Sequence, residues 1–151
     1  MSSFIGSETS VIDVKGRITV PSRLRKGLDP NAADTFRIIR GFDGAVHMYP
    51  LDEWRHFEES LRGLSKGDDD ARAVFLLLME TACEATIDSQ GRVLLTPGLL
   101  ELAGLERTAR LVGVLDHIEI WSPERFAAQV KKATPGFEAM MKSVFSRLGG
   151  D

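Results

Sequence analysis

The sequence predicts a mainly β protein with short helices, an α+β fold made of two tandem copies of one unit. The first observation is a repeat, because "DVKGRITVP" at residues 13–21 recurs as "DSQGRVLLTP" at residues 88–97. The second is that each glycine in this motif is followed by a short run of β-branched or apolar residues, which favours strands. The third is a composition of 43% hydrophobic and 27% charged residues over 151 positions, which suits a packed domain.

Each copy begins with a β-hairpin. Gly16 and Gly91 are placed at tight turns, where glycine supplies a positive φ, and Asp13 and Asp88 can accept backbone N–H bonds across those turns. Because the Asp and the Arg of the motif recur together, an ion pair between them is expected to hold the second hairpin and is one of two roles open to Arg17. The residues assigned to hairpin structure are Asp13, Gly16, Pro21, Asp88, Gly91 and Arg92.

A short helix follows each hairpin. Pro21 and Pro97 suit the first helical turn, and Thr96 is a natural N-cap in the second copy. The Asp, Gly and Arg of the motif recur 75 positions later, but the two prolines are 76 positions apart, so this alignment pairs the leucine of the first helix with Leu100. Glycines 27 and 104 are predicted C-terminal caps of the two helices. A second strand pair is then expected in each copy, at residues 36–41 with 45–49 and at 110–115 with 117–121.

Helical patterns connect and follow the two copies. Apolar residues from Trp54 to Leu64 recur at helical spacing, residues 65–70 end that run, and residues 71–82 form a second helix with an aspartate N-cap. Residues 122–124, "SPE", mark another helix start. A final apolar stripe is predicted to dock on the protein's own core: Phe137, Met140, Met141, Val144, Phe145 and Leu148.

Positive charge is concentrated at one place in an acidic chain. The protein has 19 Lys+Arg against 22 Asp+Glu, yet residues 13–26 carry a net charge of +4, whereas the equivalent residues 88–101 carry −1. Basic side chains on a turn and a neighbouring helix can meet a phosphate backbone, and arginine can also contact a guanine edge. The predicted DNA-binding residues are therefore Lys15, Arg17, Arg23, Arg25 and Lys26.

With these motifs in hand, the chain resembles the MraZ family of bacterial transcriptional regulators, within the AbrB-like swapped-hairpin superfamily. The family pattern D-x-K-G-R-x-x-x-P-x-x-x-R is complete from Asp13 to Arg25, and the second copy keeps D-x-Q-G-R at residues 88–92. The second copy departs from the pattern, because it has Gln90 in place of the lysine and no arginine in its short helix.

The resemblance implies an intertwined pseudo-twofold β-barrel made of two AbrB-like repeats, with flanking helices. It also implies a ring-like homo-oligomer that binds repeated double-stranded DNA boxes upstream of the division and cell-wall gene cluster, in the cytoplasm and associated with the nucleoid. The corresponding boundaries are a basic, DNA-reading first repeat at 4–54, a helical connector at 55–82, a second repeat at 83–128 and a C-terminal helix or tail at 129–151.

The residues bear on two other functions, an enzyme and a protein-interaction module. An enzyme is disfavoured because His47, His56 and His117 have no metal-ligand spacing and no nucleophile motif or phosphate-binding glycine loop is evident. The histidines are interpreted as surface residues, so no catalytic residue, metal, cofactor or small-molecule substrate is predicted. The single Cys83 excludes an internal disulfide, and no apolar run is long enough to cross a membrane. The alternative function is a protein-interaction or antitoxin-like module of the same hairpin fold.

Overall fold

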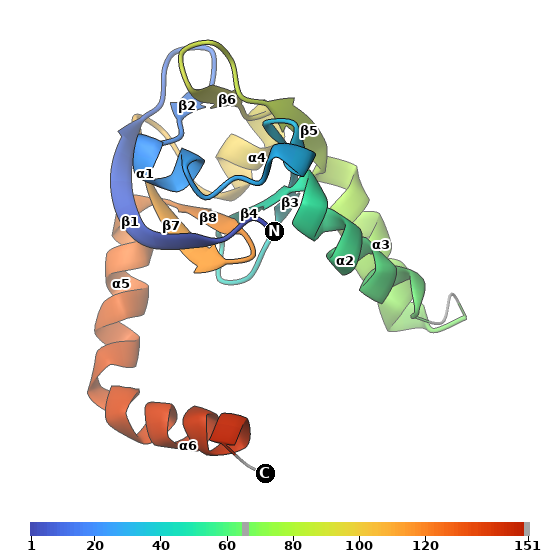
Figure 1. Ribbon diagram of the computed structural model, residues 1–151, viewed down its shortest axis with the longest axis vertical. Helices are drawn as coiled ribbons and strands as arrows, with labels where there is room; N and C mark the ends of the chain where they lie inside the picture. The colour runs from blue at the N-terminus through green and yellow to red at the C-terminus, as the bar shows by residue number, and fades with distance from the viewer. Residues whose placement is uncertain (65–66, 150–151) are drawn as a thin grey trace.

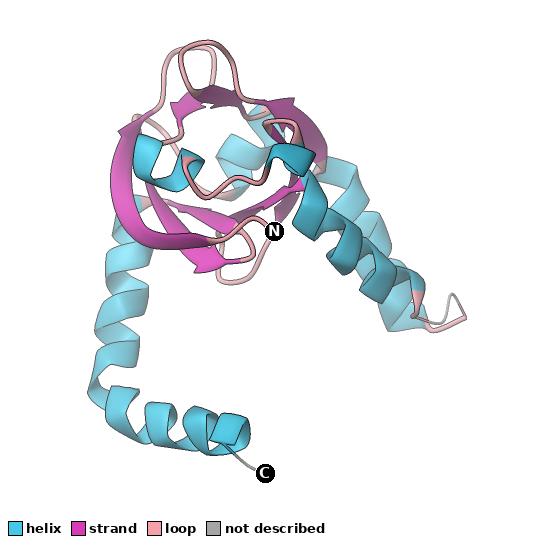
Figure 2. Cartoon of the chain, in the orientation of Figure 1, coloured by secondary structure: helices cyan, strands magenta, loops and turns pink. Residues whose placement is uncertain are grey.

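The computed structural model describes residues 1–64 and 67–149 and has the predicted α+β character (Figures 1 and 2). The first repeat contains β1 Phe4–Val11, β2 Arg17–Thr19, α1 Ser22–Arg25, η1 Pro30–Ala32, β3 Thr35–Arg40 and β4 Val46–Pro50. Next come α2 Leu51–Arg62, which begins within the predicted first repeat (4–54), and α3 Asp69–Thr81. The second repeat contains β5 Cys83–Thr86, β6 Arg92–Leu94, α4 Pro97–Leu102, β7 Thr108–Leu115 and β8 Ile118–Trp121, followed by α5 Pro123–Ala133, η2 Thr134–Gly136 and α6 Phe137–Gly149.

The two repeats are intertwined. The larger sheet has six strands in the order β1-β7-β8-β4-β3-β5, so the first strand of each repeat is an outer strand that pairs with the other repeat. The smaller sheet pairs β2 with β6, again one strand from each repeat. Exchanging the repeats leaves both orders unchanged, which defines a pseudo-twofold axis within one chain. Neither repeat can therefore complete its sheet without the other.

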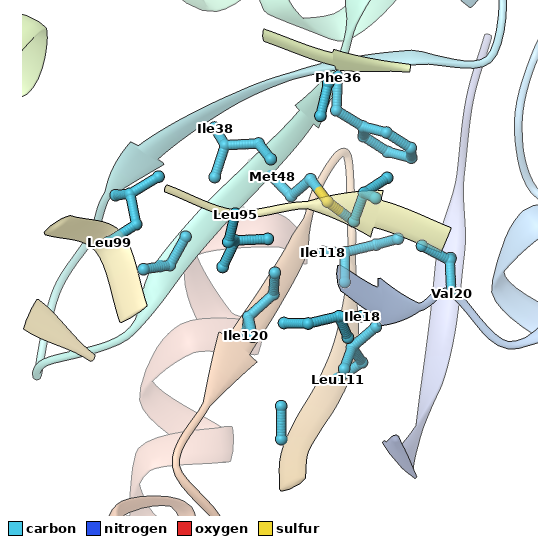
Figure 3. Close-up of a cluster of buried hydrophobic side chains, with 14 of the residues drawn as sticks. Ile18, Val20, Phe36, Ile38, Met48, Leu95, Leu99, Leu111, Ile118 and Ile120 are labelled. Carbon is cyan, nitrogen blue, oxygen red and sulfur yellow. The ribbon is translucent and has the colours of Figure 1, made fainter. Parts of the chain in front are cut away.

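The core lies between the sheets and receives side chains from both repeats (Figure 3). Ile18 and Val93 face each other in the β2–β6 ladder, and both are almost fully buried. Fully burying each such side chain contributes about 1.5–3 kcal/mol to folding. Because the burial is shared, the hydrophobic effect holds the two repeats together as one unit.

The structure corrects the register of the short helices. Pro21 is the N-cap residue of α1, whereas Pro97 is the first residue of α4 and Thr96 is its N-cap, with Oγ1 accepting a bond from the Leu99 N–H. The two prolines are therefore not equivalent. The N-caps Pro21 and Thr96 are 75 positions apart, the same separation as in the hairpins. The buried leucine of α1, Leu24, corresponds to Leu99 rather than to Leu100.

The two predicted capping glycines have different roles. Gly104 has a φ of +64° after α4, as a left-handed C-terminal cap requires. Gly27 is not among the residues with positive φ, and a Cβ there would lie 2.1 Å from the backbone oxygen of Ser3. The Ser3 N–H donates to the Gly27 carbonyl at 3.0 Å, so this glycine permits a close backbone approach instead.

The helical connector agrees with the predicted pattern. α2 and α3 lie side by side as a projecting pair (Figure 1), and the Asp68 side chain caps α3 by accepting a bond from the Ala71 N–H. Trp54 and neighbouring residues of α2 pack against Ile39 and Tyr49 in a second, smaller cluster. Ser65 and Lys66, at the start of the predicted break, lie outside the described residues.

The C-terminal helices overturn one expectation. Ser122 caps α5 as predicted, but α5 and α6 extend away from the sheets (Figure 1), and neither has a buried residue. The apolar stripe of α6 is 39–79% exposed, so it does not dock on the core of its own chain. Across residues 1–64 and 67–149, no helix combines the length and apolar character needed to cross a membrane.

Candidate nucleic-acid interface

The two hairpin turns protrude together from one end of the molecule, and we call residues 13–17 and 88–92 the paired tips (Figure 1). The β2–β6 pairing brings them together, and two further backbone bonds lock them in place. The Val20 N–H donates to the Gly91 carbonyl at 2.8 Å, and the Leu95 N–H donates to the Gly16 carbonyl at 3.0 Å. Gly16 and Gly91 both have positive φ, as their turns require.

Asp13 organises the first tip. Its Oδ1 accepts bonds from the backbone N–H groups of Lys15 and Arg17, each at 2.9 Å, and its Oδ2 accepts one from Arg17 Nε at 2.6 Å. The Arg17 N–H, the Arg17 side chain and the Lys15 N–H favour the carboxylate and lower the pKa of Asp13 from 3.8 to about 2. Arg17 is consequently held against the turn by an ionised partner.

Asp88 organises the second tip in the same way. Its Oδ1 accepts bonds from the N–H groups of Gln90 and Arg92, and Arg92 Nε donates to Oδ2 at 2.9 Å. Arg92 also reaches across the repeats, because its Nη1 lies 3.7 Å from Oδ2 of Asp13. The ion pairs predicted from the repeated Asp and Arg are therefore present in both hairpins.

Arg25 joins the paired tips from α1. Its Nε donates to the Val20 carbonyl at 2.8 Å, and its guanidinium covers Gly91, where a Cβ would lie 3.0 Å from Cζ. At the equivalent place in the other repeat, Leu100 covers Gly16. The two halves thus have the same packing, with a cation on one side and an apolar side chain on the other.

The remaining predicted DNA-binding residues do not all lie at the tips. Lys15 is exposed on the first turn. Arg23 faces β1 instead, since a Cβ at Gly6 would lie 3.3 Å from its Nη1, and Lys26 is the exposed C-cap residue of α1. The predicted set therefore divides into a group at the tips and two residues away from them, Arg23 beside β1 and Lys26 at the end of α1.

The paired tips are suited to an anionic partner. The tips and Arg25 together carry four cationic side chains, those of Lys15, Arg17, Arg25 and Arg92, and two carboxylates, those of Asp13 and Asp88. These sum to a local charge of +2 in a chain whose net charge is −3. Backbone bonds and carboxylates position the arginines before any ligand arrives, which reduces the entropy lost on binding. Such a preorganised cationic ridge can contact phosphates and, through arginine, base edges.

The structure adds two features that the sequence reasoning missed. Arg92 belongs to the same surface as Arg17, because the charges of the two repeats are interleaved and not confined to separate halves. His47 and His117 are buried and not on the surface as interpreted, and they meet Glu119 at the pseudo-twofold axis; only His56 is exposed, as expected. In the repeat alignment His47 and Glu119 occupy equivalent positions, and this equivalence could have indicated that they meet at the axis.

Comparison with known proteins identifies the chain's relatives. The sequence profile of the family described as "MraZ protein, putative antitoxin-like" matches residues 4–76 and 78–148. A protein of Clostridium beijerinckii, "Transcriptional regulator MraZ", is 42% identical over 82% of this chain and 84% of its own length. Proteins of the same name from Thermomicrobium roseum (42% identity, 85% and 87% coverage) and Natranaerobius thermophilus (35%, 93% and 96%) are also similar.

Proposed function

Because the chain belongs to the MraZ family, we propose that it is a transcriptional regulator that binds specific DNA sequences through the paired tips and α1. It acts as a ring-like homo-oligomer on repeated promoter boxes upstream of the division and cell-wall gene cluster, and it is associated with the nucleoid. The predicted DNA-binding residues, Lys15, Arg17, Arg23, Arg25 and Lys26, carry the contact.

The observation that carries this proposal is the position of Arg25 and Lys15 on a protruding, preorganised surface. Arg25 is anchored through Nε to the Val20 carbonyl, which leaves its terminal nitrogens free of that bond. Guanidinium groups held in this way can form the paired bonds to guanine that discriminate bases, while Lys15 supplies a point charge for phosphate.

Assembly into a homo-oligomer is supported by two unpartnered apolar surfaces. The α6 stripe is exposed, and so are Val74, Leu76, Leu77 and Met79 of α3. Exposed apolar surface of this kind is typical of protein–protein contacts. Oligomerisation also suits the binding, since one patch neutralises only a few phosphates, whereas linked copies on repeated boxes gain affinity through effective concentration.

The decisive experiment recovers genomic fragments bound by the purified full-length protein and sequences them. The expected result is enrichment of fragments that share a repeated motif, with binding that weakens steeply as salt rises. The matched control is the Lys15→Ala/Arg25→Ala double variant, used only if its melting temperature and molecular mass equal those of the wild type. Recovery of the same fragments by this variant would refute the assignment to the paired tips.

A second candidate function is favoured by the antitoxin-like part of the family description. On this alternative, the same cationic surface binds an acidic partner protein, and the chain serves as an interaction module. The genomic recovery separates the two, because an interaction module would give no enriched motif while retaining its fold and its oligomeric mass.

A further inference from the structure

A cluster of two buried imidazoles and one partly buried carboxylate lies where the two repeats meet. His47 comes from β4 of the first repeat, and His117 and Glu119 come from β8 and the turn before it in the second. His47 and Glu119 are directly opposite in the β4–β8 ladder, at the centre of the pseudo-twofold arrangement. The cluster has no part in the paired tips, so the proposed DNA contact does not account for it.

The donor atoms are spaced as ligands of one small metal ion. Oε2 of Glu119 lies 3.3 Å from Nε2 of His47 and 3.0 Å from Nε2 of His117, and the three residues offer donors within 4.8 Å of one another. Donors at zinc–nitrogen and zinc–oxygen distances of about 2.0–2.1 Å lie about 3.3 Å apart in a tetrahedral site. Only small movements of the side chains are needed to bring all three onto one ion.

The surrounding residues hold the donors in the orientation that a metal site requires. Nδ1 of His117 lies 2.7 Å from Oδ1 of Asp116, the carboxylate–histidine arrangement that fixes which ring nitrogen is free for a metal. The Trp121 indole N–H donates to the other oxygen of Glu119 at 2.9 Å. Tyr49 stacks on the His117 ring with centroids 4.9 Å apart, which restrains its rotation.

Gly41 makes room for the third donor. A Cβ at this position would lie 2.3 Å from Nε2 of His47 and 2.2 Å from its Cδ2, so only glycine leaves space for the imidazole. The His47 and His117 rings lie 4.7 Å apart on centroids. Gly41, which follows β3, and Tyr49 of β4 therefore help to seat the two histidines.

We propose that His47, His117 and Glu119 bind one zinc ion, which links the two repeats. Two imidazole nitrogens and one carboxylate oxygen suit zinc, whereas magnesium and calcium prefer oxygen donors alone. Three protein ligands leave a fourth position for solvent. When zinc binds, the proton between Nε2 of His117 and Oε2 of Glu119 leaves to solvent, and a zinc–nitrogen and a zinc–oxygen bond replace that hydrogen bond. Since the ligands come from both repeats, the ion stabilises the intertwined fold.

The test uses untagged full-length protein stripped with a chelator and titrated with zinc against a chromophoric chelator. We expect one zinc per chain, and a melting temperature raised by about 5 °C or more at saturating zinc. Cobalt should give the visible absorption of a tetrahedral nitrogen–oxygen site. No zinc uptake by the wild type, or uptake with no effect on melting, would overturn the proposal.

Variants assign the ligands. His47→Gln and Glu119→Gln should abolish the stoichiometric uptake, whereas His56→Gln, which alters an exposed histidine of α2, should retain it. Asp116→Asn leaves all three ligands in place and should weaken binding about 10–100-fold. It also serves if a ligand variant fails to fold, because Asp116 is 57% exposed. Equal zinc affinity in the wild type, His47→Gln and Asp116→Asn would show that the cluster is a hydrogen-bond network without a metal.

Discussion

The guanidinium of Arg25 lies against the backbone of Gly91, so a side chain of the first repeat covers the hairpin tip of the second. The pseudo-twofold mate of this contact is Leu100 over Gly16, with the leucine Cδ1 3.0 Å from where a Cβ would be. The same fold position thus holds a cation on one side of the axis and an apolar group on the other. The two repeats therefore differ in charge, but their charged residues lie on one surface, the paired tips.

Arg25 is the sharpest site for testing DNA recognition. Arg25→Ala should weaken binding to a recovered fragment by about 1–3 kcal/mol if the guanidinium contacts a base edge. Arg25→Lys keeps the charge but not the paired donors, so it should restore phosphate binding without restoring base discrimination. Fluorescence anisotropy titrations on matched and mismatched DNA measure both effects.

The control for this substitution is Arg72→Ala, which removes one positive charge from the exposed surface of α3. It should leave affinity nearly unchanged. Equal losses from Arg25→Ala and Arg72→Ala would show that only net charge matters, and the role given to Arg25 would be abandoned.

Gln90→Lys tests whether the second tip also lies at the DNA. Gln90 is the pseudo-twofold mate of Lys15, is exposed, and donates its backbone N–H to Asp88 at 2.8 Å. A lysine there keeps that bond and adds a charge, so affinity should rise and the log–log salt slope should steepen by about 0.9 per new phosphate contact. An unchanged slope would place the second tip away from the phosphates.

Much of the fold could be predicted from the sequence because its local signals are strong. The turn glycines, the Asp–Arg pairs and the Thr96 and Ser122 caps each depend on a few neighbouring residues, and all are present. The helix register was wrong because Pro21 and Pro97 look equivalent, although one precedes the helix and the other begins it. Proline suits both positions, so its identity alone does not fix the register.

Contacts that depend on long-range strand pairing could not be predicted from the sequence. Arg92 meets Asp13 only because β2 pairs with β6, and His47 meets His117 only because β4 pairs with β8. The apolar period of α6 predicted a helix correctly but did not specify its partner, since an apolar stripe is the same whether its own core or another chain covers it. The spacing of apolar residues predicts which face of a helix is apolar, but not which part of this chain or of another chain packs against that face.

Arg17→Ala and Arg92→Ala test the division of labour between the repeats. We expect Arg17→Ala to weaken specific binding and Arg92→Ala to do much less, because the second repeat has Gln90 in place of Lys15 and Leu100 in place of Arg25. Both arginines lie near Asp13, so either change can also reduce stability. Melting curves and molecular mass are therefore measured beside each titration. Equal losses of affinity in variants that melt alike would mean that Arg92 contributes to recognition as much as Arg17, and the division of labour would be wrong.

Acid titration tests the hairpin carboxylates. The Arg17 N–H, the Arg17 side chain and the Lys15 N–H lower the pKa of Asp13 to about 2, below its unfolded value, so its stabilising contribution is present above about pH 4 and is lost as pH falls toward 2. Asp13→Asn should melt lower than the wild type at neutral pH and lose less stability over that acid range. Parallel acid profiles for the two proteins would show that this carboxylate does not stabilise the fold.

The α6 stripe provides the test of assembly. Met141 and Phe145 lie one turn apart on its exposed apolar face, and neither contacts the core, so replacing both with glutamate should leave the fold of the chain intact. Charges placed in a contact between copies oppose its burial, and the molecular mass by light scattering should therefore fall at micromolar concentration. Specific DNA binding should weaken with it, because avidity is lost while the paired tips are unchanged. Glu138→Gln on the same helix is the control and should keep the wild-type mass. If the double variant keeps the wild-type mass, another surface such as α3 must hold the copies together; if the wild-type protein is itself a stable monomer, the ring is excluded.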